Sequence, residues 1–311
     1  MRRSDDGTPL RILVTGSSGV LGRALAPVLE SSGHRVVPFD LKEPHGPAVK
    51  EGQPHDVTRL DMVRATVKGV DGVVHLAAVS QAAPAEANPP YARKVNVEGT
   101  RTVLEALRWE GSPAWFVLAS SREVYGDPNG LPVDEEHPIR PKGVYGHTKA
   151  EAEQVVRDYC RPGGRQAIVL RFTNVFGDPR DHPERVVPSF VSAALRGKTL
   201  EVRGPDTVLD LLHVSDAVAA IVRTVAVLRD GVPGVEAINI ATGRGTRLGD
   251  LARKVTEITR SRSEIRNLPR VGWTSSAYVG NVAKAARLLS WRPTVDLDRG
   301  LETLIRESRE G

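Results

Sequence analysis

About the first 175 residues of the chain alternate short apolar runs with longer stretches in which apolar residues recur at helical spacing. Strands that alternate with helices are typical of an α/β fold, here a doubly wound parallel sheet. The apolar runs predict buried strands at 11–14, 35–40, 71–78, 114–119 and 166–172. The stretches between them predict helices at about 21–31, 92–110 and 147–161.

A glycine-rich turn joins the first predicted strand to the first predicted helix. It reads Thr15-Gly16-Ser17-Ser18-Gly19-Val20-Leu21-Gly22. A pyrophosphate needs backbone N–H groups and a helix N-terminus at close range, and any Cβ at the glycine positions would obstruct that approach. The turn therefore predicts a dinucleotide site.

An acidic residue ends the second predicted strand. Asp40 follows Gly22 by 18 positions, where a carboxylate can accept hydrogen bonds from the ribose hydroxyls and repel a 2′-phosphate. This favours NAD over NADP. Lys42 is close enough to keep NADP open as an alternative.

Tyr145 and Lys149 are four residues apart, which places both side chains on one face of a helix. Ser121 follows the strand predicted at 114–119, at the edge of the sheet where ligands bind. A nearby ammonium stabilises a phenolate, so we expect Lys149 to lower the pKa of Tyr145 and to make it a usable base or acid. Taken singly, each of these residues has an ordinary alternative role in packing, solvation or capping.

Composition narrows the classes of protein to which this chain can belong. The chain has 311 residues, 40% of them hydrophobic, which is enough for one large or two modest domains. No apolar stretch approaches the roughly 20 residues of a membrane span and no signal peptide is recognisable, so we expect a cytoplasmic protein with no membrane partner. The net charge is +5, but the basic residues are scattered and only 5% of residues are aromatic, so we expect no nucleic-acid partner. The single cysteine, Cys160, has no metal-ligating neighbours in the sequence, and no metal is expected.

Together these motifs resemble the extended short-chain dehydrogenase/reductases, in the NAD-dependent epimerase/dehydratase branch that acts on nucleotide-activated sugars. The resemblance extends through His75-Leu76-Ala77-Ala78 and Asn96-Val97-Glu98-Gly99-Thr100 to Leu289-Ser290-Trp291-Arg292-Pro293. It implies an NAD-binding Rossmann domain at 1–175 with a return segment at about 236–242. It also implies a smaller α/β substrate-binding domain, mainly within 176–311, and a homodimer formed through the two helices at 92–110 and 147–161.

The resemblance assigns roles to individual residues. Tyr145 is the acid/base, Lys149 tunes it and holds the nicotinamide ribose, and Ser121 bonds the reacting hydroxyl. The other expected NAD contacts lie on the glycine turn and at strand ends: Gly16, Ser18, Gly19, Val20, Leu21, Gly22, Asp40, Leu41, Asp56, Val57, Leu76, Ala77, Ala78, Asn96 and Phe172. The other expected substrate contacts are Ser80, Glu123, Asn174 and Arg270.

Three positions depart from the family pattern, and at one of them Ser80 stands where some hexose epimerases carry lysine. Sugar dehydratases usually carry aspartate and glutamate where this chain has Arg122-Glu123, and a guanidinium cannot be a general acid because it stays protonated. Glu123 could position a substrate hydroxyl, act as a base, or pair with Arg122. Leu209 stands directly before Asp210, where relatives that hold a nucleoside diphosphate usually have an arginine.

The function that the resemblance implies is NAD-dependent epimerisation of a nucleotide-activated sugar, by transient oxidation at C4 and return of the hydride. One alternative is a net sugar or uronate dehydrogenase or a keto-sugar reductase. Another, from a different class, is a dinucleotide-binding regulatory or RNA-associated protein.

Overall fold

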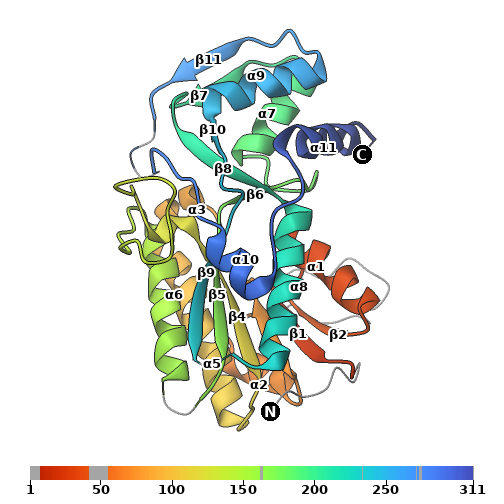
Figure 1. The fold of residues 1–311 in the computed structure, drawn as a ribbon, viewed down its shortest axis with the longest axis vertical. Coiled ribbons are helices and arrows are strands. Elements are labelled where there is room, and N and C mark those ends of the chain that lie inside the picture. Colours follow the sequence, from red (N-terminus) through yellow and green to blue (C-terminus); the bar gives the residue numbers. More distant parts are fainter. Residues whose placement is uncertain are drawn as a thin grey trace.

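The computed structural model describes residues 8–41, 55–161, 164–232, 234–270, 272 and 275–310. Within these ranges six parallel strands form a central sheet with the order β2-β1-β3-β4-β5-β9 (Figure 1). They are β1 (Arg11–Thr15), β2 (Arg35–Phe39), β3 (Gly72–His75), β4 (Trp115–Ser121), β5 (Ala167–Phe172) and β9 (Val235–Ile240). This arrangement confirms the predicted α/β class with a doubly wound parallel sheet.

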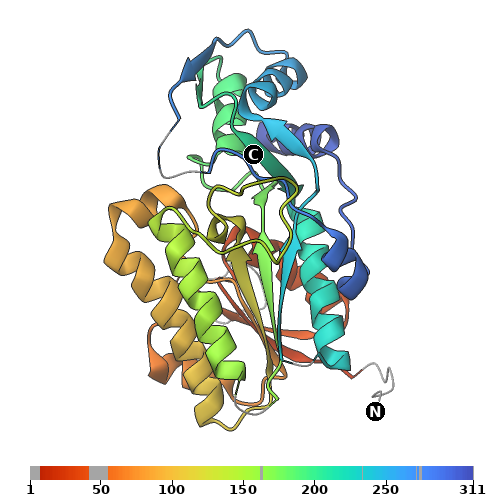
Figure 2. The same ribbon diagram turned by 60° about the vertical axis from the view of Figure 1, so that its left-hand side comes forward.

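Helices cover both faces of the central sheet, because its strands present apolar side chains in both directions. Along β1, Ile12 and Val14 pack on one side and Leu13 on the other. The first face carries α1 (Val20–Ser31), α8 (Val214–Asp230) and α10 (Ala283–Leu289). The second face carries α2 (Leu60–Val67), α5 (Gly99–Trp109) and α6 (Val144–Cys160), with α5 and α6 side by side (Figure 2).

A run of short helices leads into α5. It comprises α3 (Ala82–Ala87), α4 (Pro89–Arg93) and the π-helical turn η1 (Lys94–Glu98). The helix predicted at 92–110 is therefore three consecutive segments. The helix predicted from 147 begins earlier, at Val144, and this puts Tyr145 in the first turn of α6.

The remaining elements form a smaller part above the carboxyl ends of the central strands (Figure 1). In the described residues its strands form a sheet of order β10-β8-β6 and a pair β11-β7 around a separate apolar core. The strands are β6 (Asn174–Phe176), β7 (Leu200–Arg203), β8 (Val208–His213), β10 (Gly245–Arg247) and β11 (Ile265–Leu268). The helices are α7 (Val186–Leu195), α9 (Leu248–Thr259) and α11 (Leu297–Glu310). The exact domain boundary near residue 175 stays a prediction.

Asp210 ties the two parts together. Its carboxylate, on β8, is fully buried and accepts hydrogen bonds from the Thr242 N–H and hydroxyl, the Gly243 N–H and the Gly280 N–H. Burial raises the pKa of Asp210, and these donors act in the opposite direction by stabilising the carboxylate. The segment after β9 and the segment before α10 are thereby fixed against β8.

No helix in the described ranges has both the length and the apolar character needed to cross a membrane.

Candidate active site

The glycine turn packs too closely for side chains at two of its positions. Gly16 has φ of +69°, and a Cβ there would lie 2.6 Å from the Ala77 backbone nitrogen. A Cβ on Gly22 would lie 2.4 Å from the Gly16 carbonyl oxygen, whereas one on Gly19 would lie 3.2 Å from that oxygen. Gly16 and Gly22 are thus required by the fold itself. Gly19 leaves room that suits a close ligand.

The turn delivers the N-terminus of α1 to the carboxyl end of β1. The helix begins at Val20, and no described side chain caps its first N–H groups. On the other side of the turn, Asp40 Oδ2 accepts a hydrogen bond from the Ser18 N–H at 2.9 Å. Free helical N–H groups, small residues and a carboxylate at the next strand end fit a dinucleotide. Lys42, which kept NADP open, lies outside the described residues.

A buried hydrogen-bond chain runs from the glycine turn toward α6. His75 Nδ1 lies 2.7 Å from the Thr15 hydroxyl, and His75 Nε2 lies 3.1 Å from the Thr100 hydroxyl. Thr100 donates to the Asn96 carbonyl, and Asn96 Nδ2 donates to the Thr148 hydroxyl at 2.9 Å. Burial, and next the charge of Lys149, lower the pKa of His75 to about 3, so the ring is neutral.

Asn96 therefore has protein partners for its side-chain amide. Besides the Thr148 contact, its Oδ1 accepts from the Val79 N–H at 2.8 Å and its Nδ2 donates to the Val79 carbonyl. These bonds hold the segment after β3, which contains the predicted cofactor contacts Leu76, Ala77 and Ala78. A direct contact between Asn96 and a cofactor stays a prediction.

The three residues expected to be catalytic meet between β4 and α6. The Ser121 hydroxyl is hydrogen-bonded to the Tyr145 side chain, and it also accepts from the Glu123 N–H at 3.2 Å. Lys149 Nζ lies 6.0 Å from the centre of the Tyr145 ring and donates to the Ala119 carbonyl at 2.8 Å. Burial lowers the pKa of Lys149 to about 8.

The expected lowering of the Tyr145 pKa is wrong for the structure as it stands. Burial raises the pKa of Tyr145, because the free energy needed to remove a phenolate from water exceeds the stabilisation by neighbouring charges and hydrogen bonds. The cation that acts most strongly against this effect is Arg185, followed by the hydrogen bond from Ser121. Lys149 directs its ammonium to a backbone carbonyl instead.

Arg185 is a site residue that the sequence analysis missed. It occupies the N-cap position of α7 without a side-chain capping bond, and its guanidinium lies 3.4 Å from the Ser80 hydroxyl and 3.6 Å from the Asp181 carboxylate. Ser80 thus lies near the guanidinium that acts on Tyr145. The contact of Ser80 with substrate stays a prediction. No sequence motif marks Arg185, since it lies 40 residues after Tyr145.

Arg122 and Glu123 form the ion pair that was one of the three alternatives for Glu123. Arg122 Nη2 lies 2.7 Å from Glu123 Oε1, in the short 3₁₀ turn η2 (Arg122–Val124). Arg122 is buried, its guanidinium lies over the Tyr278 ring, and its Nη1 has no partner among the described residues. Both charges act on Tyr145, so this pair lies beside the reacting group. A direct contact between Glu123 and substrate stays a prediction.

Other predicted substrate residues lie at the junction of the two parts or beyond it. Asn174 begins β6, and its buried Oδ1 has no partner in the described structure, which leaves an acceptor for a ligand. Arg270 follows β11 and packs over Gly204, on the small two-stranded sheet. Leu209 is buried in the apolar core of the smaller part, so its side chain is a packing residue.

The remaining predicted cofactor residues border the same edge of the central sheet. Phe172 ends β5 opposite Ser121. Asp56 accepts from the Thr58 N–H, Val57 is buried against Gly99, and Leu41 is exposed.

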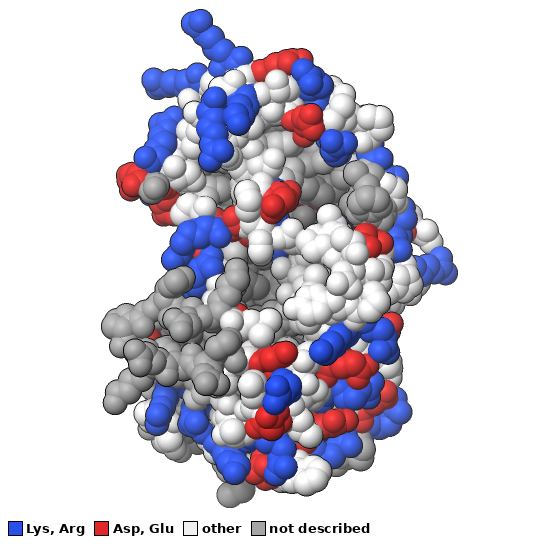
Figure 3. Space-filling view, turned by 180° about the vertical axis from the view of Figure 1, so that it is seen from behind, with Lys and Arg blue, Asp and Glu red and all other residues white. Residues whose placement is uncertain are grey.

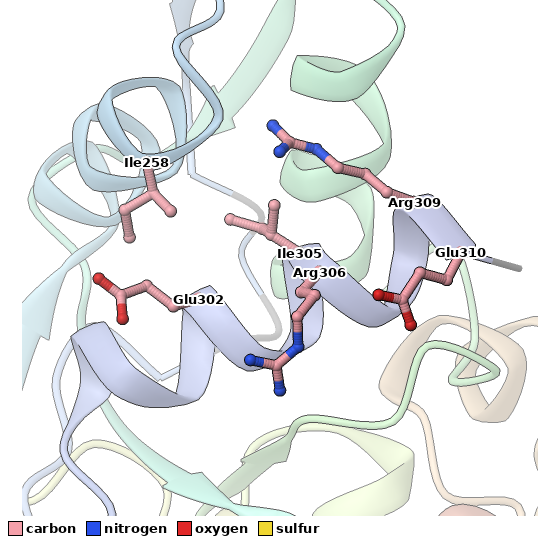
Figure 4. Close-up of a pocket in the computed structure, with 6 residues that line it drawn as sticks. All are labelled: Ile258, Glu302, Ile305, Arg306, Arg309 and Glu310. Carbon is pink, nitrogen blue, oxygen red and sulfur yellow. The ribbon is translucent and has the colours of Figure 1, made fainter.

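Two features lie apart from this cluster. A shallow pocket between α9 and α11 is lined by Ile258, Glu302, Ile305, Arg306, Arg309 and Glu310 (Figure 4), none of which is a predicted site residue. On the face shown in Figure 3, basic and acidic side chains are interspersed over the lower half.

No group of three metal-ligating side chains occurs within the described ranges. Burial raises the pKa of the Cys160 thiol to about 11, which makes it a poor nucleophile.

Known proteins resemble this chain over most of its length. The family described as "NAD dependent epimerase/dehydratase family" matches residues 12–241. A UDP-glucose 4-epimerase of Rhizobium leguminosarum bv. trifolii is 33% identical over 92% of this chain and 93% of its own. UDP-glucuronic acid decarboxylase 1 of Xenopus tropicalis is 31% identical over 96% of this chain and 72% of its own. The solved structure of MoeE5 in complex with UDP-glucose and NAD superposes with a TM-score of 0.89 at 29% identity, and the match covers 96% of this chain and 99% of that one.

Proposed function

Because the chain belongs to the NAD-dependent epimerase/dehydratase family, we propose that it is an NAD-dependent epimerase of a nucleotide-activated sugar, with C4 as the reacting carbon. The observation that carries this proposal is the cluster of Ser121, Tyr145 and Lys149 beside a dinucleotide turn. Arg122 supports epimerisation over dehydration, because it is paired with Glu123 and cannot act as an acid. That the matched relatives are enzymes favours catalysis over the regulatory or RNA-associated alternative.

The residues of the glycine turn, the N-terminus of α1 and Asp40 would hold NAD. NAD held there would supply the hydride acceptor and, once reduced, the hydride donor. Tyr145 takes the proton of the sugar hydroxyl and later gives it back, while Ser121 holds the reacting oxygen. Arg185 is the cation that acts most strongly on the Tyr145 phenolate, and the Lys149 ammonium, 6.0 Å from the centre of the ring, would offset the charge on the transient alkoxide.

UDP is the nucleotide that the named relatives suggest. Arg185 adds a guanidinium whose charge acts on Tyr145, and such a group favours a sugar with an anionic substituent. The substrate panel therefore includes a hexose and a hexuronate: UDP-glucose, UDP-galactose, UDP-glucuronate and free glucuronate.

The test follows product stereochemistry by NMR and NADH by its absorbance with each of these sugars. Epimerisation changes the configuration at C4 without net NADH. In Tyr145→Phe we expect turnover to fall by roughly 10²- to 10⁴-fold, since a general acid/base is lost. Tyr91→Phe, on the exposed side of α4, is the matched control and should retain turnover. Unchanged turnover in Tyr145→Phe would refute the proposal.

A net dehydrogenase or reductase is the second candidate, and Leu209 is the observation that favours it. A buried leucine supplies no phosphate contact, so a substrate without a diphosphate would lose less at this position. Steady accumulation of NADH with free glucuronate, and no epimer with any UDP-sugar, would establish this alternative.

A homodimer in the cytoplasm belongs to the same proposal. The apolar residues Val97, Val103, Leu104 and Leu107 are buried within the chain, so they face its own core and not a partner. The outer faces of α5 and α6 instead carry charges, and Arg93, at the end of α4, forms an ion pair with Glu151 on α6. A dimer through these helices would be polar. Light scattering at low and high salt should show it weaken as salt rises.

A further inference from the structure

Glu153 lies one helical turn after Lys149, on the face of α6 that carries Tyr145 and Lys149. It is a buried carboxylate, with 3% of its surface exposed. Buried carboxylates are costly unless they are paired and hydrogen-bonded. Its partners therefore show why it is retained in this place.

Three side chains hold Glu153 in one orientation. The Ser120 hydroxyl donates to Oε1 at 2.6 Å. Arg171, on β5, approaches as a fork, with Nε 3.0 Å from Oε1 and Nη2 2.8 Å from Oε2. Arg157, one turn further along α6, donates to Oε2 at 3.1 Å. Both oxygens are thus fixed by partners on two strands and one helix.

These bonds connect Glu153 to the catalytic cluster through β4. Ser120 is the middle of three successive β4 residues, and its two neighbours bond Tyr145 and Lys149. The same short piece of strand therefore holds three successive turns of α6. The distance between the strand and the helix, on which the position of the phenol depends, is set in part by Glu153.

Glu153 also provides negative charge close to a buried ammonium. Of the titratable groups that act on Lys149 or lie beside it, Tyr145 and Glu153 are on α6 and His75 is on β3. His75 is neutral, and Tyr145 carries charge only as the phenolate. Glu153 is the carboxylate that raises the pKa of Lys149 against the effect of burial.

We propose that Glu153 is a positioning residue for the reaction: held by Ser120 and Arg171, it fixes α6 against β4 and keeps the Lys149 ammonium charged beside Tyr145. This role rests on the proposed function, because it acts through Lys149 on the proton transfer of Tyr145. Without the carboxylate, Lys149 becomes neutral at lower pH, and the site loses the positive charge that lies 6.0 Å from the centre of the Tyr145 ring.

The first experiment measures the titration of Lys149 without using catalysis. In protein with isotopically labelled lysine, the Lys149 side-chain resonance is assigned by its loss in Lys149→Met and followed by NMR as pH rises. We expect the midpoint to fall by roughly one pH unit in Glu153→Gln. Glu151→Gln is the matched control, since Glu151 lies on the exposed side of α6 and pairs with Arg93. It should leave the midpoint where the wild type has it.

The second experiment measures kcat and KM against pH in the same variants. In Glu153→Gln the alkaline limb of kcat should move to lower pH by the same amount, with KM and NAD affinity within twofold of wild type. A purely structural loss would lower kcat at every pH without moving this limb. If the wild type epimerises no sugar nucleotide, the proposed function fails, while the NMR titration still tests the charge relation.

Glu153→Asp provides the test if Glu153→Gln does not fold. It keeps the charge but withdraws it by one methylene from Ser120 and Arg171, so the Lys149 midpoint should fall by a smaller amount. A Lys149 midpoint equal to that of the wild type in whichever of the two variants folds would overturn the proposal.

Discussion

The Arg23 guanidinium on α1 lies 2.9 Å from the carboxylate of Asp178, which follows β6 in the smaller part of the chain. Another nitrogen of Arg23 donates to the Ser18 carbonyl in the glycine turn. A cation in the first turn of a helix opposes the helix dipole, so Arg23 depends on these acceptors for its place. The turn predicted to hold the dinucleotide is thus bonded to the part predicted to hold the sugar.

Breaking this pair should loosen both parts. In Asp178→Asn we expect the free energy of unfolding to fall by about 1–3 kcal/mol, because a largely buried guanidinium loses its charged acceptor. NAD affinity, measured by fluorescence quenching, should fall as well. Arg23 would no longer be fixed by Asp178, and the Ser18 carbonyl in the glycine turn would lose a well-placed donor. Arg180→Met is the control, because Arg180 also pairs with Asp178 but is exposed. Equal denaturation midpoints for the two variants would contradict this prediction.

The glycine turn should separate folding from cofactor binding. Gly22→Ala places a methyl 2.4 Å from the Gly16 carbonyl, so we expect the loop to be displaced and the protein destabilised. Gly19→Ala meets that oxygen only at 3.2 Å and keeps an allowed φ of −75°, so its thermal midpoint should stay close to wild type. Its NAD affinity should still fall by at least about tenfold, because the methyl occupies the approach to the N-terminus of α1. Normal NAD binding in a stable Gly19→Ala would show that the pyrophosphate lies elsewhere.

Acidification should destabilise the protein through His75. Its pKa is lowered from 6.5 to about 3 in the folded protein, so between these values the unfolded chain binds a proton that the folded chain excludes. Stability is therefore lost as pH falls below 6.5, by about 2 kcal/mol at pH 5. Urea denaturation at pH 7.5 and pH 5 measures the loss.

The variant His75→Asn isolates this contribution. It cannot take up the proton, so its stability should be lower than that of the wild type at pH 7.5 but should decline less on acidification. If both proteins lose equal stability between the two pH values, His75 does not account for the acid sensitivity.

Restoring the family arginine at position 209 should not restore a phosphate contact. Leu209 is buried in the apolar cluster of the smaller part, so Leu209→Arg would bury a guanidinium without a partner and cost roughly 2–5 kcal/mol. Leu209→Met, which keeps apolar volume, should cost less than about 1.5 kcal/mol. A stable Leu209→Arg with a lower KM for a UDP-sugar would show that this side chain reaches the substrate.

Much of the fold and of the catalytic set was accessible from local patterns. Each of the five predicted strands lies within about three residues of an observed strand, and the helices at 21–31 and 147–161 form. The spacing of Tyr145 and Lys149 and the glycines of the turn could be read directly, because helix periodicity and turn chemistry depend on near neighbours. The short strands of the smaller part were not predicted, since their pairings join residues far apart in the chain.

The sequence by itself determined which groups can do chemistry here: a phenol, an ammonium and a hydroxyl at the edge of a parallel sheet. Only the tertiary structure decided their environment. It brought Arg185 close enough to act on Tyr145 and placed Glu153 between Ser120 and Arg171. It also buried the Leu209 side chain in an apolar core. The physical reason is that burial and charge depend on whatever packs nearby in space. The pKa of Tyr145 therefore rose where its helical neighbour alone predicted that it would fall.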